Sequence, residues 1–469
     1  MTENNAESCG IFSGALQLLL AFLNLLFPNN KPKVQYGVFA IILYYIYFFL
    51  DGYDSQTISV CMRAFEVSLG LSPSSASLLA TVEFMATLGC CPLWGFLADK
   101  FSVNYVAGGA MFLSGMTCIL LGNALSYPVI LSLRFLHGFA LACTAPAKQK
   151  IITDSYATDH GTYFGFCHAA NCFGRLISAV VTTYTSMAMF LGRHGWRMCY
   201  CAMGYVWILM GTFVVFFMKP NPEPKASNTD FFDAIKATFK GSTSYLLLFA
   251  IYISDAPFGA FVYIISYLQY VGLSDFMAGV CCATALIGGL IGGAAGGPLV
   301  TLCHNADPKH GRLSVGTLIV ASRILIVLAI FRGPMPTGGK LAWFHYLEFA
   351  LFGASLMTVS SVDSAIVADI VKQEYQASAS AIYRCFAGIP SSATFVPLCG
   401  FLAEKAFGYT PTTQSVHKMS DELKALNARV LANSMMYVVG VSTVINVACY
   451  VAMLFTYSGD KQGEQKCGK

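Results

Sequence analysis

Long apolar stretches separated by short polar connections run through most of the chain. Most of them reach the roughly 20 residues that an α-helix needs to cross the hydrocarbon core of a bilayer. The pattern predicts an all-α integral membrane protein with twelve membrane-spanning helices. We expect these spans at residues 35–59, 76–97, 103–123, 128–151, 162–187, 196–218, 243–270, 276–302, 313–331, 343–369, 375–402 and 432–456.

A further apolar stretch, residues 11–27, is slightly short for a crossing and follows an acidic start. Its polar residues Ser13, Gln17 and Asn24 fall along one helical stripe, which is typical of an amphipathic helix lying in the membrane interface. We therefore predict a cytoplasmic N-terminal tail, residues 1–33, that contains this interfacial helix. A thirteenth span over the same residues is the alternative.

The distribution of basic residues predicts the orientation. If the N-terminus is cytoplasmic, fifteen of the 28 Lys and Arg residues fall in inside segments and nine in outside segments, and the other four lie within spans. An excess of basic residues in short loops marks the cytoplasmic side. Both termini are therefore expected in the cytoplasm.

Composition agrees with a membrane protein and excludes several other classes. The 469 residues are 56% hydrophobic and 11% charged, with a mean hydropathy of +0.61. Disorder is excluded by this apolar content. The net charge of +4 comes without a basic block, so no nucleic-acid partner is expected.

Neither a catalytic motif nor a metal-binding pattern is present in the sequence. The 17 cysteines fall mostly inside apolar stretches and form no Cys-x-x-Cys pair with histidines at ligand spacing, so we interpret them as packing residues. HExxH, GxSxG and P-loop sequences are also absent. We predict that the protein is not an enzyme and has no metal site and no cofactor.

The spans divide into two sets of six around residues 219–242, which are first Pro-rich and then amphipathic. Gly138 and Asp154 are matched 215 residues later by Gly353 and Asp369. Two related six-helix halves are a common plan of transporters. We predict an N-terminal bundle over 34–218, a central cytoplasmic linker, a C-terminal bundle over 243–457 and a cytoplasmic tail over 458–469.

Several motifs carry a family resemblance. The sequence GFLADK at 95–100 resembles the loop after span two that is a signature of the major facilitator superfamily, although the glycine and basic residues that usually follow are replaced by FSVN. FLDGYDSQTISV at 49–60 resembles the spinster-like branch, and PAKQKIITDS, HGTYFGF, RHGWR and PLCGFLAEKAFGY are similar to uncharacterised spinster-like carriers of plants and protists. The resemblance implies two pseudo-symmetric six-helix bundles and transport by alternating access.

Charged residues within the spans are the main functional candidates, because an ionisable group at the bilayer centre costs about 2.5–3.5 kcal/mol on insertion scales. By depth in the membrane, we expect four of these charged residues in the outer half, Arg175 and Asp255 near the middle, and the others in the inner half. The candidates for transport and proton coupling are Asp51, Asp54, Glu83 and Arg134 (outer), Asp255 (middle), and Asp363 and Arg384 (inner).

The resemblance implies that spans one, four, seven and ten line a central cavity, where Asp54, Arg134, Asp255 and Asp363 would meet solute. An arginine beside Asp54 or Glu83 suits proton coupling, because it keeps the carboxylate ionised until the contact is lost. A permanent structural ion pair is the alternative, and a structural role is favoured for Arg175. Further candidates for the cavity wall are Tyr53, His137 and Tyr263, with His137 either a proton relay or a packing residue.

The loop after span two has a separate expected role. On the family reading, the Asp99 carboxylate accepts hydrogen bonds from the first amides of span eleven, where the helix dipole favours an anion. Gly95, Asp99 and Lys100 would then form a gating loop that stabilises the outward-open state. The alternative is a solvated loop acid.

The leading functional hypothesis is a secondary active transporter that moves a small organic solute, with protons as the coupling ion. The expected partners are the solute, protons and membrane lipid, and we expect a monomer in the plasma membrane or in the membrane of an acidic organelle. A transport-inactive relative that serves as a receptor or scaffold is the alternative.

Overall fold

The computed structural model describes residues 38–69, 73–156, 159–186, 188–190, 192–218, 231–334, 336, 340–410 and 419–467. The predicted interfacial helix at 11–27 and the Pro-rich part of the linker lie outside these residues. Nearly every described segment is helical.

The N-terminal half contains six long helical segments. They are α2 (Val38–Leu69), α3 (Pro73–Lys100), α4 (Val103–Asn123), α5 (Tyr127–Leu141) continued by α6 (Thr144–Ser155), α7 (His160–Ser186) and α8 (Gly195–Phe217). A short antiparallel hairpin of β1 (Met189–Phe190) and β2 (Arg193–His194) joins α7 to α8. The predicted spans two to six therefore agree closely with the observed helices.

The C-terminal half begins with α9 (Phe231–Thr238), the amphipathic part of the predicted linker. It continues with α10 (Ser242–Ser254), α11 (Ala256–Ala260), η1 (Phe261–Tyr263), α12 (Ile264–Tyr270), α13 (Asp275–Ala306), α14 (Gly311–Arg332), α15 (Trp343–Ile370), η2 (Gln373–Tyr375), α16 (Gln376–Phe401), the π-helical η3 (Leu402–Ala406) and α17 (Asp421–Cys467). The span that starts with α10 is interrupted at Asp255, two residues before Pro257, whose missing N–H breaks the helical ladder.

Eleven helical segments in the described part of the chain are long and apolar enough to cross a membrane. With the 32-residue helix α2, which is not among these eleven, the predicted twelve are complete. Two boundaries were wrong. α2 continues to Leu69, and α17 extends from Asp421 to Cys467 through the predicted tail. A search for apolar stretches detects only the part of a helix that lies within the hydrocarbon core. The extensions of α2 and α17 beyond their apolar stretches were therefore missed.

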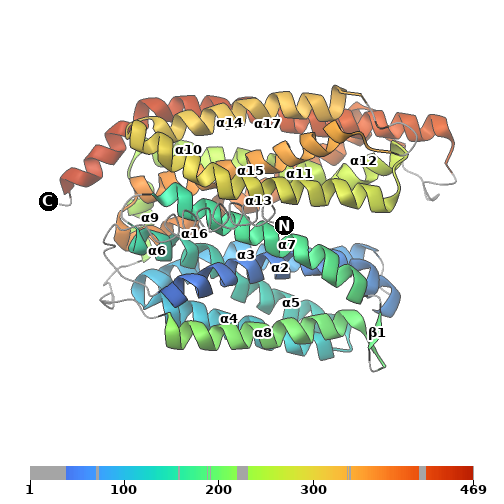
Figure 1. Ribbon diagram of the computed structural model, residues 1–469, viewed down its shortest axis with the longest axis horizontal. Coiled ribbons are helices and arrows are strands. Elements are labelled where there is room, and N and C mark those ends of the chain that lie inside the picture. The colour runs from blue at the N-terminus through green and yellow to red at the C-terminus, as the bar shows by residue number, and fades with distance from the viewer. Residues whose placement is uncertain are drawn as a thin grey trace, which may run out of the picture.

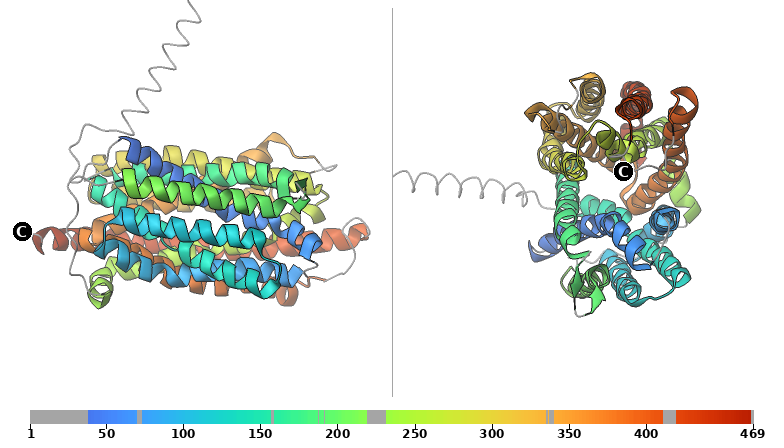
Figure 2. Two further views of the ribbon diagram at one scale, coloured as in Figure 1. Left: turned by 90° about the horizontal axis from the view of Figure 1, so that it is seen from below. Right: turned by 90° about the vertical axis from the view of Figure 1, so that its right-hand side faces the viewer.

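The two halves form two layers, with the N-terminal helices in blue to green and the C-terminal helices in yellow to red (Figure 1). The view along the helices shows each half as a separate bundle (Figure 2). The N-terminal bundle has one large core that includes Trp196 and Trp207. The core of the C-terminal bundle has two main parts, one of which contains Tyr383 and Tyr450.

One helix, α13, carries two stripes of glycine that allow close contacts on two sides. Gly288, Gly292 and Gly296 pack against α15. Gly293 and Gly297 pack against α7 of the other half, and a Cβ at either position would lie only 2.6 Å from a backbone oxygen of α7. Small residues at these positions let the helix backbones of the two halves come together.

We expect Gly293→Leu to destabilise the contact between the halves by about 1–3 kcal/mol, because the leucine would overlap backbone that cannot shift without separating α7 from α13. The measurement is thermal unfolding of the purified protein in detergent. Gly279→Leu on the same helix is the control, since a Cβ there meets nothing within 4 Å. Equal melting temperatures for the two variants would contradict this prediction.

Candidate functional site

The two halves meet mainly through α3 with α16, α7 with α13, and α6 and α7 with α15 or α16. Hydrogen bonds between the halves gather at one end of the bundles, which is the end that the distribution of basic residues predicts to be cytoplasmic. Gln149 of α6 donates to the Gln376 side chain (3.0 Å) and to the backbone oxygen of Ser364 (3.3 Å). This end is therefore closed in the structure.

Asp99 contributes the most buried contact at the closed end. Its carboxylate accepts hydrogen bonds from the backbone N–H groups of Ala377 (3.2 Å) and Ser378 (2.7 Å) in the first turn of α16, and its side chain has 0% exposure. Lys150 lies 3.6 Å from the same carboxylate. The contact has the geometry that the gating hypothesis requires, whereas the gating role remains a prediction.

Gly95 permits this contact, since a Cβ at that position would lie 2.7 Å from the Cβ of Ala381 in α16. Lys100 does not take part in the contact with α16 but places its ammonium 5.4 Å from the centre of the Phe96 ring. Of the three predicted gating residues, the structure therefore brings Gly95 and Asp99 to the other half.

A group of charged residues lies between the halves, deeper in the membrane than the Asp99 contact. Asn171 of α7 donates to the Asp51 carboxylate of α2 (2.8 Å) and accepts from Nε of Arg175 (3.0 Å). Arg384 of α16 is exposed although it lies within a span. Its helix, α16, packs against α3 and α6 of the N-terminal half.

Arg384 lies on the same face of α16 as Ala377 and Gly388, which contact Asp99 and Leu88 of α3, so its exposed guanidinium faces the N-terminal half. We call Asp51, Lys148, Arg175, Asp255 and Arg384 the central charge site. Asp255 also accepts a hydrogen bond from Ser391 (3.0 Å). The depth prediction for Asp51 was wrong, because α2 continues to Leu69 and Asp51 lies near the middle of the helix rather than in its outer half.

A second polar group lies inside the N-terminal bundle, and we call Asp54, Glu83, Arg134 and His137 the N-bundle cluster. Arg134 Nη2 lies 2.8 Å from the Glu83 carboxylate, and His137 Nε2 lies 3.0 Å from Asp54 Oδ2 and 3.8 Å from Glu83. The side chains are only 1–8% exposed. Two carboxylates thus share one arginine and one histidine in an environment almost without solvent.

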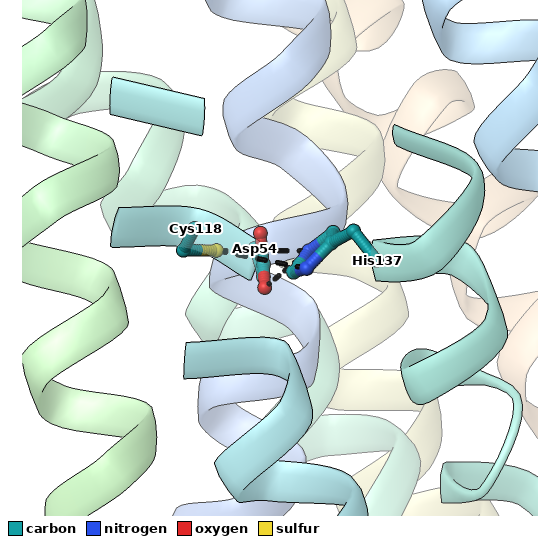
Figure 3. A group of neighbouring side chains, drawn as sticks. All are labelled: Asp54, Cys118 and His137. Carbon is teal, nitrogen blue, oxygen red and sulfur yellow. Dashed lines mark hydrogen bonds and ion pairs between the residues drawn. The ribbon is translucent and has the colours of Figure 1, made fainter. Parts of the chain in front are cut away.

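Aromatic and sulfur-containing side chains surround this cluster. Trp207 donates its indole N–H to Asp54 Oδ2 (2.7 Å), and Arg134 donates to the Tyr200 hydroxyl (3.1 Å). Figure 3 shows Cys118, Asp54 and His137 converging from three helices. Their ligand atoms lie within 4.8 Å of one another, a spacing that could hold a metal ion.

The surrounding contacts argue against a metal at this place. Asp54 Oδ2, the oxygen that faces His137, is already occupied by Trp207 (2.7 Å) and His137 Nε2 (3.0 Å). Arg134 also places a permanent positive charge beside the two carboxylates, which disfavours a second cation. We therefore interpret the group as a buried, hydrogen-bonded charge cluster rather than as a metal centre.

The C-terminal bundle has a corresponding buried contact. Tyr450 of α17 donates a hydrogen bond to Asp363 of α15, and Arg323 of α14 donates to the hydroxyl (3.1 Å) and the backbone oxygen (3.2 Å) of Ser355. Asp363 is 8% exposed and Arg323 is 1% exposed. Their partners come from helices of the same bundle.

The placement predicted for several candidates was therefore wrong. Asp54, Arg134 and Asp363 do not face the space between the halves, since their partners lie within their own bundles. His137 is buried with them and does not line a cavity. Tyr53 and Tyr263 are half-buried and also bond within their own halves, Tyr53 to a threonine of α7 and Tyr263 to a backbone oxygen of α16.

Sequence reasoning missed four residues that the structure places at these sites. Lys148 was placed near the cytoplasmic surface and counted with the inside segments, and it was not named as a site residue; it lies in the second half-span helix α6. Asn171 gave no signal because a single amide in an apolar helix is common. Trp207 and Tyr200 resembled ordinary apolar residues of span six, and only the fold reveals their hydrogen bonds to the cluster.

Comparison with known proteins decides the family. The family model described as the Major Facilitator Superfamily matches residues 44–395. The chain belongs to this superfamily. The twelve-helix fold class and the multi-pass membrane location are thereby confirmed, and the matched relatives are transporters rather than enzymes.

Similarity to individual superfamily members is low. An uncharacterized transporter of Buchnera aphidicola (subspecies Schizaphis graminum) is 21% identical over 234 residues, 49% of this chain and 52% of the relative. The chain thus spans about half the length of that curated relative. The crystal structure of a bacterial homologue of the human lysosomal transporter Spinster, inward-facing and unoccupied, has a TM-score of 0.59 at 17% identity, covering 90% of this chain and 98% of that chain.

The fucose:proton symporter FucP of Escherichia coli has a TM-score of 0.64 at 12% identity, covering 87% of this chain and 98% of that chain. At such low identity both structures establish the fold alone. The resemblance of this superfamily member to the spinster-like branch is confirmed at that level.

Proposed function

We propose that the protein is a secondary active transporter that carries a small organic solute by alternating access and couples this movement to protons. The observation that carries the proposal is the central charge site, which lies between two separate bundles directly above a closed cytoplasmic end. Rocking of the two bundles about such a site would expose it to each side in turn. The printed functions of the Spinster homologue and FucP support the same class.

The N-bundle cluster is the proposed proton site. With Arg134 charged, its two carboxylates leave one negative charge, and one proton on His137 or on either acid makes the group neutral. His137 Nε2 is hydrogen-bonded to Asp54 (3.0 Å) and lies 3.8 Å from Glu83, so a small shift of the ring would bring it within hydrogen-bond distance of the second acid. The facing groups Cys118 and Tyr200 complete the titratable surroundings. The cluster is almost without solvent in this conformation. Proton exchange would therefore take place in the second conformation of the transport cycle.

The experiment uses the full protein in vesicles with a panel of labelled metabolites. Uptake is measured with and without a pH gradient, and solute exchange is measured without any gradient. We expect the wild type to accumulate a solute when the gradient is present. Asp54→Asn should lose accumulation but keep exchange, because it removes the proton site and leaves the central charge site intact.

Three outcomes bear on the proposal. Unchanged accumulation by Asp54→Asn would reject this site for coupling, and equal uptake with and without the gradient in the wild type would reject coupling itself. Absence of flux for every metabolite would favour the transport-inactive alternative. Asp421→Asn is the control, since Asp421 is an exposed acid at the opposite end of the sequence.

The remaining expectations are part of the same proposal. The N-terminal bundle, linker and C-terminal bundle would act as two rigid bodies joined by α9, and the protein would work as a monomer surrounded by lipid. The protein would lie in the plasma membrane or in the membrane of an acidic organelle.

A further inference from the structure

An apolar groove runs along the outer surface of the C-terminal bundle, between α14 and α17. These two helices pack against each other at the edge of that bundle opposite the N-terminal bundle (Figure 1). The groove has a volume of about 350 Å³, and none of its nine lining residues is charged. An apolar cavity of about 150 Å³ already holds a benzene molecule, so this groove has room for part of a lipid chain.

The groove is hollowed at one glycine and bordered by larger side chains. A Cβ at Gly440 of α17 would meet no atom within 4 Å. Leu328 of α14 and Val444 of α17 border the groove, and both are exposed within membrane-spanning segments. From Met436 to Ile445 the groove extends about 13 Å along α17, at a rise of about 1.5 Å per residue. It therefore opens to lipid and follows the direction of the lipid chains.

An exposed arginine lies at the end of the groove that is farther from the closed end of the molecule. Arg332 is the last residue of α14, and its Nε lies 3.4 Å from Sδ of Met436, which lines the groove. Trp343 at the start of α15 is exposed and belongs to the same end, because His345 donates a hydrogen bond to the backbone oxygen of Pro334 (2.8 Å). Exposed tryptophans are typical of the membrane–water interface. Arg332 therefore lies at the depth of lipid headgroups.

A second exposed arginine adds positive charge beyond this end of the groove. Arg429 precedes Met436 by seven residues, about two helical turns, so the two lie on the same face of α17. In the part of the chain that the structure describes, neither Arg332 nor Arg429 forms an ion pair. An apolar groove thus ends at two guanidinium groups that no carboxylate neutralises.

The size and charge of this surface favour a lipid over a protein partner. A stable protein interface has about 20–30 residues on each side, whereas only nine residues line the groove. A neutral sterol would fill the groove without using either arginine. A phospholipid uses both parts, since its chain is apolar and its phosphate is a preferred partner of a guanidinium group.

We propose that the groove binds a phospholipid with a net negative headgroup, in the leaflet on the side away from the closed end. One acyl chain lies between α14 and α17 beside Gly440, and the phosphate contacts Arg332. Arg429 attracts the remaining negative charge of the headgroup. The bound lipid joins two helices of the same bundle, so its binding depends neither on rocking of the halves nor on transport.

The test uses the full protein and two probes that differ in headgroup charge, dioleoyl phosphatidylglycerol (anionic) and dioleoyl phosphatidylcholine (neutral overall). The protein is reconstituted in vesicles with equal amounts of both, extracted with a mild detergent, and its retained lipids are quantified by mass spectrometry. Each lipid is also added to delipidated protein while the melting temperature is recorded. We expect the wild type to retain phosphatidylglycerol over phosphatidylcholine by about fivefold for each arginine that contacts the headgroup, and only phosphatidylglycerol to raise the melting temperature.

Two variants separate the headgroup contact from the groove. Arg332→Gln should lower the preference for phosphatidylglycerol by about fivefold. Without added lipid it should melt as the wild type does, because the exposed guanidinium forms no ion pair with a described residue. Gly440→Leu fills the groove and should abolish both the preference and the lipid-dependent rise in melting temperature, although both arginines remain. Gly459→Leu is the matched control on α17, since a Cβ there also meets nothing within 4 Å, and it should bind lipid as the wild type does.

Equal retention of the two lipids by the wild type would overturn the proposal, and so would a full preference in Gly440→Leu. If the extracted protein is a dimer that Gly440→Leu dissociates, the groove is instead an interface with a second copy of the chain. Displacement of phosphatidylglycerol by an equal concentration of oleate would show that the groove takes a free fatty acid rather than a phospholipid. None of these measurements involves transport, so each result leaves the proposed function to its own experiment.

Discussion

Arg134→Ala is expected to lower the free energy of unfolding by about 3–5 kcal/mol, the cost of removing one partner of a buried ion pair. Arg134 is 1% exposed and its guanidinium contacts Glu83, while Asp54 lies beside them on His137. Without the arginine, two carboxylates remain in a nearly dry bundle with only a histidine to compensate. The melting temperature in detergent should fall by roughly 3–5 °C.

A double variant separates charge from packing. Replacing both partners, Glu83→Gln with Arg134→Met, removes one negative and one positive charge together and keeps the volume nearly constant. It should recover more than half of the loss, since a buried pair replaced by neutral groups is often neutral in stability. Arg332→Ala, an exposed arginine at the end of α14, is the single-site control. Equal melting temperatures for Arg134→Ala and this control would contradict the prediction.

The sequence was sufficient to predict the twelve spans, because a membrane helix needs a long apolar stretch and few other structures tolerate one. The Asp99 contact was predicted through the family resemblance of GFLADK at 95–100, which implied a partner at the start of span eleven. Gly138 and Gly353, matched 215 residues apart, take corresponding places: each lets a backbone pass closely, α5 against α3 and α15 against α13.

The direction of each charged side chain could not be predicted in the same way. Asp51 and Asp54 are three residues apart, so they point about 60° from each other around α2. That rotation separates a residue at the interface between the halves from one inside the bundle. A membrane helix is surrounded by apolar groups on nearly every side, so its sequence has no polar face that would indicate its rotation about its axis. The rotation of α2 depends instead on its packing with α7 and α8.

The two bundles contain comparable buried charges, which explains why depth alone misled the prediction. In the N-terminal half, Arg134 faces Glu83, and in the C-terminal half Arg323 and Asp363 lie among α14, α15 and α17. Each arginine finds its partners inside its own half. Arg384 differs because, among the described residues, no carboxylate of its own half lies within ion-pair distance, and its side chain is exposed within a span.

Asp99→Asn is expected to open the closed end of the molecule. The carboxylate holds two backbone amides of α16 and faces Lys150, whereas an amide oxygen carries no charge and can satisfy these donors only weakly. A hydrogen bond to a charged group contributes about 1.5–3 kcal/mol. If the conformation that is closed at this end loses about 1.5–3 kcal/mol of stability, the equilibrium shifts toward the conformation that is open there by roughly 10- to 100-fold.

Hydrogen–deuterium exchange of the full protein in detergent measures this opening without labels. Amides of α6 and of the first turns of α16 should exchange faster in Asp99→Asn, while those of α4 and α14, which lie within single bundles, should not change. Asp307→Asn is a matched control, because the Asp307 carboxylate also accepts two backbone amides (3.0 and 3.2 Å), but within its own loop. Faster exchange throughout both bundles would indicate unfolding, and unchanged exchange in α6 would show that the Asp99 contact does not hold the halves together.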